Sequence, residues 1–326
     1  MTGLHIIFDG RNTAYRANVV TELYTKQGIR TSAILGTLNI THSTLEEMNK
    51  LYNLPIKEGI FVWDKGHSAR RKEVYPEYKA NRKKEWTPED ELWIKEFHYQ
   101  TDALHSNLKL FGMKSYRKQG WEGDDLVFGF TEQLSKKNPN DISIIVSTDE
   151  DFHQLISSTV HVYSPIKKIL YTPDNYKELT GIDVESFLAY KILKGDKSDG
   201  IPGIEGIGEK TAKTLVNKYG GLGKLLQHTE DLKKSKRTAK IVTEEGLEIL
   251  DRNDKLINLK DYVDLAPVKD DIKDILNSTI TVEPMKVYDF LMKYQLTSIV
   301  VKYKEWLTAF RDMVDNFSTD IIEETD

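Results

Sequence analysis

The sequence predicts an α/β protein with a mainly parallel central sheet flanked by helices. Short apolar runs at 4–8, 59–63, 113–116, 142–146 and 160–163 are typical of buried strands. Segments with helical periodicity lie between them, at 32–52, 91–111 and 124–136. Such alternation favours parallel strands joined by helices that cover both faces of the sheet. Ligands of these sheets bind at the carboxyl ends of the strands.

The pattern changes near residue 183, where short helices with glycine-rich turns begin and no convincing strand follows. We therefore expect an α/β core over 1–182 with an insertion at about 65–100. A helical region over 183–300 and a C-terminal helix with an acidic tail over 301–326 complete the expected organisation.

Composition permits a globular enzyme: the chain has 326 residues, 39% of them apolar, and a net charge of only −5. It contains no cysteine, which excludes disulfides, thiol nucleophiles and thiolate zinc sites. We find no apolar run of about 18 residues and no leader, so we expect a soluble, cytoplasmic protein that makes no use of a membrane.

Three predicted strands end in aspartate, at Asp9, at Asp64 and at Asp149 with Asp151. A single aspartate in this position is usually a helix cap or a turn former. Because parallel strands place their carboxyl ends at one edge, three together indicate a site.

Two further acidic groups follow the same pattern. Glu122, Asp124 and Asp125 open a helix, and Asp196 and Asp199 lie in a glycine-flanked turn. Helix capping is the ordinary interpretation of the first group, and a solvated turn is that of the second. Three acids within four residues repel one another, however, and bound cations offset that repulsion most simply.

The nine candidate ligands are all hard oxygen donors, which suits Mg²⁺ or Mn²⁺ and not zinc. Two such ions about 4 Å apart suit phosphodiester hydrolysis. Calcium storage is the alternative, but no EF-hand spacing occurs. The candidates are Asp9, Asp64, Glu122, Asp124, Asp125, Asp149, Asp151, Asp196 and Asp199.

Two other segments indicate nucleic acid. Gly206 and Gly208 precede an amphipathic helix that carries Lys210 and Lys213, which favours backbone contact with phosphate over an ordinary tight turn. Residues 65–84 are rich in lysine and arginine with aromatic residues between them, as in single-strand channels, although a solvated charged face is the common alternative.

Taken in order, five segments resemble the 5′ nuclease family, which includes flap endonucleases, bacteriophage 5′ exonucleases and the nuclease domain of bacterial DNA polymerase I. The set is specific, although each segment alone is weak. The segments are Ile7-Phe8-Asp9-Gly10, Phe61-Val62-Trp63-Asp64, Gly120-Trp121-Glu122-Gly123-Asp124-Asp125, Ser147-Thr148-Asp149-Glu150-Asp151, and Gly195 through Ala212.

The resemblance implies a division of the acids between two metal sites. Asp9, Asp64, Glu122 and Asp124 would mainly serve the first. Asp149, Asp151, Asp196 and Asp199 would complete the second, and Asp125 lies next to the group.

The resemblance also implies roles for basic and glycine residues. The insertion would form a helical arch over the 5′ strand, with Lys79 and Arg82 contacting the scissile phosphate. The 183–300 region would bind duplex DNA through a helix–two-turn–helix element, which commonly holds K⁺ on backbone carbonyls. The other implied DNA contacts are Arg16, Arg71, Tyr78, Gly206, Gly208, Lys210 and Lys213.

The implied activity is that of a structure-specific 5′ nuclease, a 5′-3′ exonuclease and flap endonuclease that removes RNA primers in replication. Its substrate is DNA with a 5′ flap or a single-strand/duplex junction, with RNA–DNA hybrid as a further candidate, and we expect a monomer. Because no polymerase region follows residue 300, we expect a bacteriophage enzyme in the host cytoplasm. A ribonuclease of a related acidic-site fold and a non-catalytic branched-DNA-binding protein remain alternatives, and no protein partner is indicated.

Overall fold

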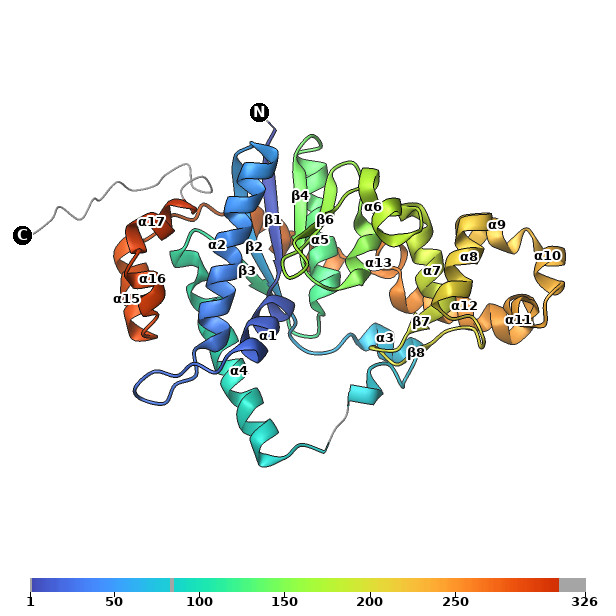
Figure 1. Cartoon of the computed structure of the whole chain (residues 1–326), viewed down its shortest axis with the longest axis horizontal. Coiled ribbons are helices and arrows are strands. Elements are labelled where there is room, and N and C mark those ends of the chain that lie inside the picture. The colour runs from blue at the N-terminus through green and yellow to red at the C-terminus, as the bar shows by residue number, and fades with distance from the viewer. Residues whose placement is uncertain (1, 83–84, 311–326) are drawn as a thin grey trace, which may run out of the picture.

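The computed structural model describes residues 2–82 and 85–310, and within them it contains the predicted mainly parallel sheet (Figure 1). The strand order is β3-β2-β1-β4-β5-β6, with the first five strands parallel and the last antiparallel. The strands are β1 (Leu4–Asp9), β2 (Ile56–Trp63), β3 (Lys114–Arg117), β4 (Ile142–Val146), β5 (Val160–Ser164) and β6 (Ile169–Tyr171).

All five predicted strands are confirmed. The short strand β6 was not predicted. The expectation of no strand after residue 183 is wrong by one small pair, β7 (Gly195–Asp196) and β8 (Ile201–Pro202). Two-residue strands carry no periodicity, so the sequence pattern gave no sign of them.

Strand β1 is central because later strands are added to the sheet on both sides of it. It pairs with β2 on one side and with β4 on the other. The order of strands therefore reverses between β1 and β4, and the carboxyl ends at such a point form the usual ligand site of an open α/β sheet.

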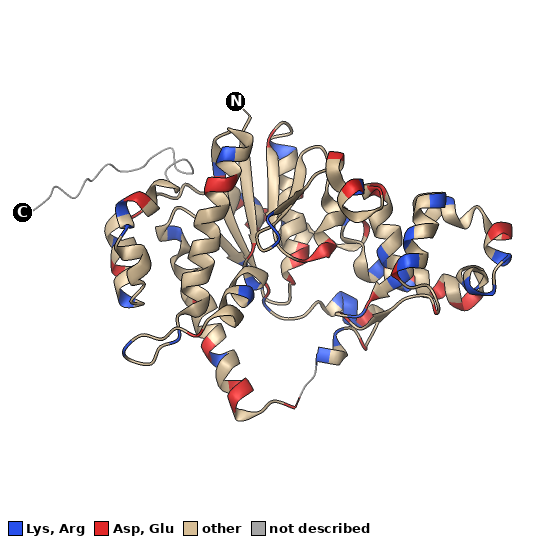
Figure 2. Cartoon of the chain, viewed as in Figure 1, with Lys and Arg blue, Asp and Glu red and all other residues tan. Residues whose placement is uncertain are grey.

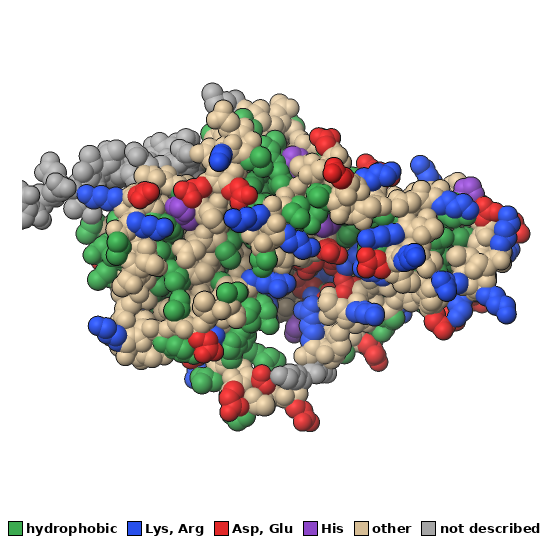
Figure 3. All heavy atoms as spheres, in the orientation of Figure 1, with side chains coloured by type: hydrophobic (Ala, Val, Ile, Leu, Met, Phe, Trp, Pro, Cys, Tyr) green, Lys and Arg blue, Asp and Glu red, His purple; other side chains and the backbone are tan. Residues whose placement is uncertain are grey.

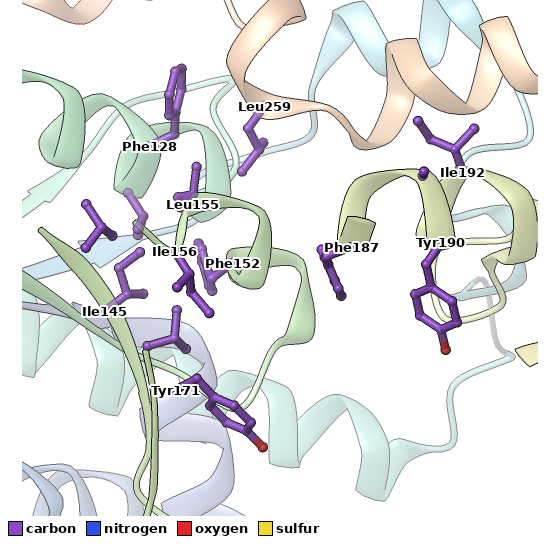
Figure 4. Packing of buried hydrophobic residues seen from close by; sticks show 14 of the residues in the cluster. Phe128, Ile145, Phe152, Leu155, Ile156, Tyr171, Phe187, Tyr190, Ile192 and Leu259 are labelled. Atoms are coloured by element: carbon purple, nitrogen blue, oxygen red, sulfur yellow. The ribbon is translucent and has the colours of Figure 1, made fainter. Parts of the chain in front are cut away.

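Both faces of the sheet are covered, which explains why its central strands, such as β1 and β4, are mostly apolar instead of alternating. On β1, Ile6 and Phe8 belong to a core that includes Leu38 of α2, whereas Ile7 belongs to a second core with Val127 of α5. The second core extends from Phe152, in the 3₁₀ helix after β4, into the helical region, where Phe187 of α7 is part of it (Figure 4).

The three predicted helices are present with small differences at their ends. The 32–52 helix is α2 (Ser32–Tyr52), and the 124–136 helix is α5 (Gly123–Lys137). The 91–111 helix is α4 (Pro88–Asn107), which begins earlier because Thr87 and Asp90 form a capping box. A 3₁₀ turn, Leu108–Leu110, continues it.

The remaining helices before residue 200 are α1 (Gly10–Val20), α3 (Ala69–Val74), α6 (Pro173–Thr180) and α7 (Phe187–Lys194). Those after it are α8 (Glu209–Tyr219), α9 (Leu222–Leu226), α10 (Thr229–Lys233), α11 (Lys236–Ala239), α12 (Glu244–Ile257), α13 (Leu259–Tyr262), α14 (Lys269–Asn277), α15 (Pro284–Lys293), α16 (Thr297–Val300) and α17 (Tyr303–Thr308). The α8–α11 helices lie at the opposite end of the molecule from α15–α17 (Figure 1).

Helix α4 extends away from the strands, and residues 75–82, which follow α3, lie below the sheet in this view (Figure 1). Lys83, which belongs to the basic insertion, and most of the expected acidic tail lie outside the described residues. Within the described part, no helix is long and apolar enough to cross a membrane.

Candidate active site

Asp9 joins the carboxyl ends of the two central strands. Its Oδ1 accepts a hydrogen bond from the backbone N–H of Asn12 at 3.0 Å, so it caps α1, as the ordinary interpretation expects. Its Oδ2 accepts from the hydroxyl of Ser147, just past β4, at 2.9 Å. A capping residue is thereby fixed between the ends of β1 and β4.

Asp64, just past β2, is tied to the first turn of α5. Its Oδ1 accepts from the backbone N–H of Gly123 at 3.0 Å. A Cβ at position 123 would lie 3.2 Å from Asp64 Oδ2, so glycine allows this close approach. The contact brings Asp124, in the first turn of α5, to the same edge of the sheet.

Four carboxylates at this edge have no compensating cation: within residues 2–82 and 85–310, Asp9, Asp64, Asp124 and Asp149 form no ion pair. Burial, and then the charge of Asp64, raises the pKa of Asp9 to about 7. Burial, and then the charge of Asp149, raises the pKa of Asp124. The four groups therefore repel one another, which is the electrostatic condition for cation binding.

The other five acids are paired with cations of the protein. Arg71, only 3% exposed, donates from Nη2 to Asp125 Oδ1 at 2.7 Å and from Nη1 to Glu122 Oε2 at 3.1 Å. Its Nε donates to the carbonyl of Leu256 at 3.0 Å. All three guanidinium nitrogens of Arg71 are bonded inside the protein, which argues against the DNA contact expected for it. Asp125 accepts from Arg71 with both oxygens, so it is a partner of Arg71 and not a free metal ligand.

Replacing Arg71 by methionine is expected to destabilise the fold by about 3–5 kcal/mol, because Glu122 and Asp125 would stay buried without their cation. Denaturant unfolding of the Arg71→Met protein measures this free energy, with Lys72→Met in the same helix as the control. A loss no larger than that of the control would contradict the assignment.

Tyr78 is likewise an internal residue. Its side chain is 2% exposed, and its hydroxyl donates to Glu122 at 2.9 Å and to Asp199 at 3.1 Å. The hydroxyl of Tyr78 already lies against two acids, which argues against the DNA contact expected for it. Burial opposes ionisation of Glu122, but Arg71 and then Lys79 hold its pKa below the ordinary value.

Lys79 and Arg82 reach the acids from the insertion. Lys79 Nζ lies 3.0 Å from Glu122 Oε2 and 3.7 Å from Asp199 Oδ2. Arg82 Nη2 lies 2.5 Å from Asp199 Oδ1, and its side chain is 55% exposed. Lys79 has a left-handed backbone (φ 57°), which is uncommon outside glycine, and its N–H is bonded to the Asp199 carbonyl at 2.8 Å. The basic insertion is thus anchored on the acidic group.

A residue that the sequence analysis missed, Lys191 of α7, holds the last two acids. Its ammonium lies 2.6 Å from Asp151 Oδ1 and 2.5 Å from Asp196 Oδ2. Burial acts to raise the pKa of Asp196, but Lys191 lowers it to about 2. The available signal was a lysine one turn from Phe187 on an otherwise apolar helix, a position that the periodicity marks as buried.

The donor set fits a hard divalent cation, since every candidate ligand is a carboxylate. Four of these carboxylates also repel one another and have no cation of the described protein beside them. The described residues nevertheless contain no group of three or more such side chains that already converges to hold an ion. Ion pairs to Arg71, Lys79, Arg82 and Lys191 account for five of the nine acids.

Two pockets flank the acidic group. One, of about 820 Å³, brings together Arg16, Asp149, Lys191, Gly206 and Gly208. The other, of about 940 Å³, is lined by Asp64 and by the aromatic side chains Tyr15, Trp63, Trp86, Trp93 and Phe97. Figure 3 shows lysine and arginine side chains around a gathering of acidic ones on the face of the molecule in view, and Figure 2 shows the acidic and basic positions on the ribbon in the same orientation.

The glycine hairpin forms an exposed start to α8. Gly206 has φ 79°, and Gly208 caps the helix without any side-chain hydrogen bond. Lys210 is exposed, whereas Lys213 is paired with Glu209 at 3.0 Å. A helix N-terminus of this kind can accept phosphate.

Comparison with known proteins decides the family. The model of the 5′-3′ exonuclease N-terminal resolvase-like domain matches residues 4–181, and that of the 5′-3′ exonuclease C-terminal SAM fold matches residues 182–278. The chain belongs to the 5′-3′ exonuclease family.

Relatives of this exonuclease-family chain include the 5′-3′ exonuclease of Aquifex aeolicus, 30% identical over 82% of this chain and 85% of that protein. The DNA polymerase I of Caldicellulosiruptor bescii is 34% identical over 71% of this chain, but the match spans only 26% of the polymerase. Among solved structures, T5 5′-exonuclease with bound divalent metal ions (zinc) has a TM-score of 0.70 at 25% identity, over 84% of this chain and 98% of that one.

Proposed function

We propose that this protein is a structure-specific 5′ nuclease that hydrolyses phosphodiesters where a single-stranded 5′ end meets duplex DNA. Family membership supports the reaction type. The observation that carries the proposal is the set of uncompensated carboxylates, Asp9, Asp64, Asp124 and Asp149, at the point where strand order reverses.

Divalent cations, Mg²⁺ or Mn²⁺, are the proposed cofactors, with two ions in the complete site. Bound there, they supply Lewis-acid stabilisation of the attacking and leaving oxygens. Asp9, Asp64, Asp124 and Asp149 are the residues best placed to hold the first ion, since no cation of the described protein occupies them. Asp151, Asp196 and Asp199 are proposed for the second ion, as the resemblance implies. Glu122, which the resemblance placed with the first ion, is proposed here for the second because it is ion-paired as those acids are.

The two pockets divide the substrate between them in this proposal. Duplex DNA lies along the hairpin and Arg16, where backbone N–H groups and cations meet phosphates independently of sequence. The displaced 5′ strand enters the aromatic pocket, since bases of any identity stack on Trp86 and Trp93. Asp64 and Asp149 each line one pocket, so the acids lie between the two. Lys79 and Arg82 are then proposed to contact the scissile phosphate.

The proposal has four finer features. Primer RNA is an alternative 5′ strand, and K⁺ binds the hairpin carbonyls within a helix–two-turn–helix element. The protein is a monomer and acts in the cytoplasm. A role in DNA replication is supported by the similarity to DNA polymerase I of several bacteria, of which this chain spans about a third or less.

A panel of 5′-labelled substrates tests the proposal. A flap duplex, a single strand and a blunt duplex of the same sequence are incubated with the protein and Mg²⁺. The proposal expects the flap to be cut at or next to the junction, leaving a 5′-phosphate on the downstream strand. Equal cleavage of all three substrates would contradict structure specificity.

Lys210→Ala is expected to weaken duplex binding by about 1 kcal/mol or less and to reduce the salt dependence of binding by roughly one phosphate contact. Lys213→Ala is the matched comparison, since Lys213 is paired with Glu209 and should change both less. Fluorescence anisotropy of a labelled duplex at several salt concentrations measures both slopes. An unchanged slope in Lys210→Ala would remove that residue from the interface.

A further inference from the structure

The nine acids fall into two sets according to what neutralises them. Asp9, Asp64, Asp124 and Asp149 form no ion pair within the described residues, and the remaining five all do. This division differs from the one that the resemblance implied, because Glu122 falls with the paired acids and Asp149 with the unpaired ones. The structure therefore distinguishes acids that need an external cation from acids that already have an internal one.

Lys191 is a buried internal cation that holds two of these acids. Its side chain is 5% exposed, and its ammonium touches Asp151, beyond β4, and Asp196, in β7, at 2.6 and 2.5 Å. These two acids lie on segments 45 positions apart, and the lysine joins them from a third element, α7. Without a cation between them, the two carboxylates would face each other at short range.

We propose that Lys191 is an internal counter-ion which stands in for the second divalent cation, so that the protein alone binds one ion readily and a second only when this ammonium is displaced. The inference rests on the proposed function, and it concerns the order and affinity of metal binding instead of the reaction. It also accounts for the lack of a convergent group of ligands among the described residues.

Mutual exclusion follows from distance and charge. Mg²⁺ lies about 2.0–2.1 Å from its oxygen ligands, so an ion bound between Asp151 and Asp196 would occupy nearly the same space as the ammonium. The two positive charges would also repel. One of them must therefore leave before the other can take its place.

A neighbouring pocket could accept the displaced ammonium. Lys191 lines the pocket of about 820 Å³ that also contains Arg16, Lys194 and Gly208. We proposed above that DNA phosphate binds there. A phosphate in this pocket would attract the ammonium away from Asp151 and Asp196, so DNA should favour binding of the second ion.

Calorimetric titration of the DNA-free protein with Mn²⁺ tests the inference. Wild type should bind one ion and take up a second far more weakly. Lys191→Met, which keeps the length and removes the charge, should bind the second ion at least about tenfold more tightly, a change of the size that supporting residues of metal sites produce. Lys191→Arg, which keeps the charge, should behave as wild type.

A measurement on the wild-type protein covers the case in which Lys191→Met does not fold. The ¹H–¹⁵N signal of a buried lysine ammonium can be followed during Mg²⁺ titration and assigned by its loss in Lys191→Arg. It should persist while the first ion binds and disappear as the second does.

The possible failures are distinguishable. Equal second-ion affinity in wild type and Lys191→Met, or an ammonium signal unchanged at saturating Mg²⁺, would overturn this inference alone. Wild type that binds no Mn²⁺ would overturn the metal site of the proposed function as well.

Discussion

The Asp149→Ala protein is expected to lose about a hundredfold to a thousandfold in cleavage rate while it keeps most of its affinity for DNA. Asp149 is exposed at the rim of the acidic group and forms no ion pair within the described residues, so its removal should leave the fold intact. The loss should resemble that of other electrostatic groups that act on the transition state, where one donor is worth roughly 10²–10³ in rate.

Single-turnover cleavage of a flap substrate, together with anisotropy of the same substrate in Ca²⁺, separates the two effects. Glu178→Ala, an exposed acid on α6, is the control and should cleave at the wild-type rate. Cleavage by Asp149→Ala at the wild-type rate in Mg²⁺ would show that the site has been assigned wrongly. Asp149 caps only the short 3₁₀ helix Glu150–Leu155, whereas Asp9 caps the longer α1 and also accepts a hydrogen bond from Ser147, so Asp9 is a poorer choice for this test.

Lys79→Ala is expected to lower the cleavage rate by about 10²-fold or more and duplex affinity by much less. Lys79 lies on the acidic group itself, 3.0 Å from Glu122, and not on the surface that we propose for duplex DNA. Its uncommon backbone conformation, fixed by the Asp199 carbonyl, is consistent with a position maintained for function.

Glu122 loses one of its two cations in this variant, which could destabilise the fold. Cleavage rate and duplex affinity must therefore be measured on the same preparation. Thermal unfolding reports the cost to the fold, which Arg71 and Tyr78 should limit by continuing to hold Glu122. A Lys79→Ala protein that loses rate and duplex affinity equally would make Lys79 a general phosphate contact.

The fold was predictable where burial is strong. The central strands β1, β2 and β4 are visible in the sequence because both sheet faces are covered, which makes most of each strand apolar. Strand β6, at the edge of the sheet and antiparallel to its neighbour, is apolar but has only three residues, too few to show a pattern. The β7–β8 pair is shorter still.

The carboxylates of the site were also predictable, since strand ends and the first turn of α5 collect at one edge of a parallel sheet. Their partners were not. Arg71 and Tyr78 were assigned to DNA because the insertion is basic and aromatic, but α3 packs against α12 and turns Arg71 inward to Leu256. Ion pairs that join segments tens of residues apart leave no trace in local periodicity. The periodicity of α7 marks Lys191 as buried but does not indicate the two acids that it holds.

The most direct test of divalent-metal-dependent 5′ cleavage is to start the reaction by adding metal to a preformed complex of protein and DNA. Protein and a 5′-flap substrate are mixed in EDTA, and excess Mg²⁺ is then added. We predict no product before the addition, and afterwards a single cut at the junction that leaves a 5′-phosphate. Cleavage at the same rate in EDTA, or none with either Mg²⁺ or Mn²⁺, would contradict the account.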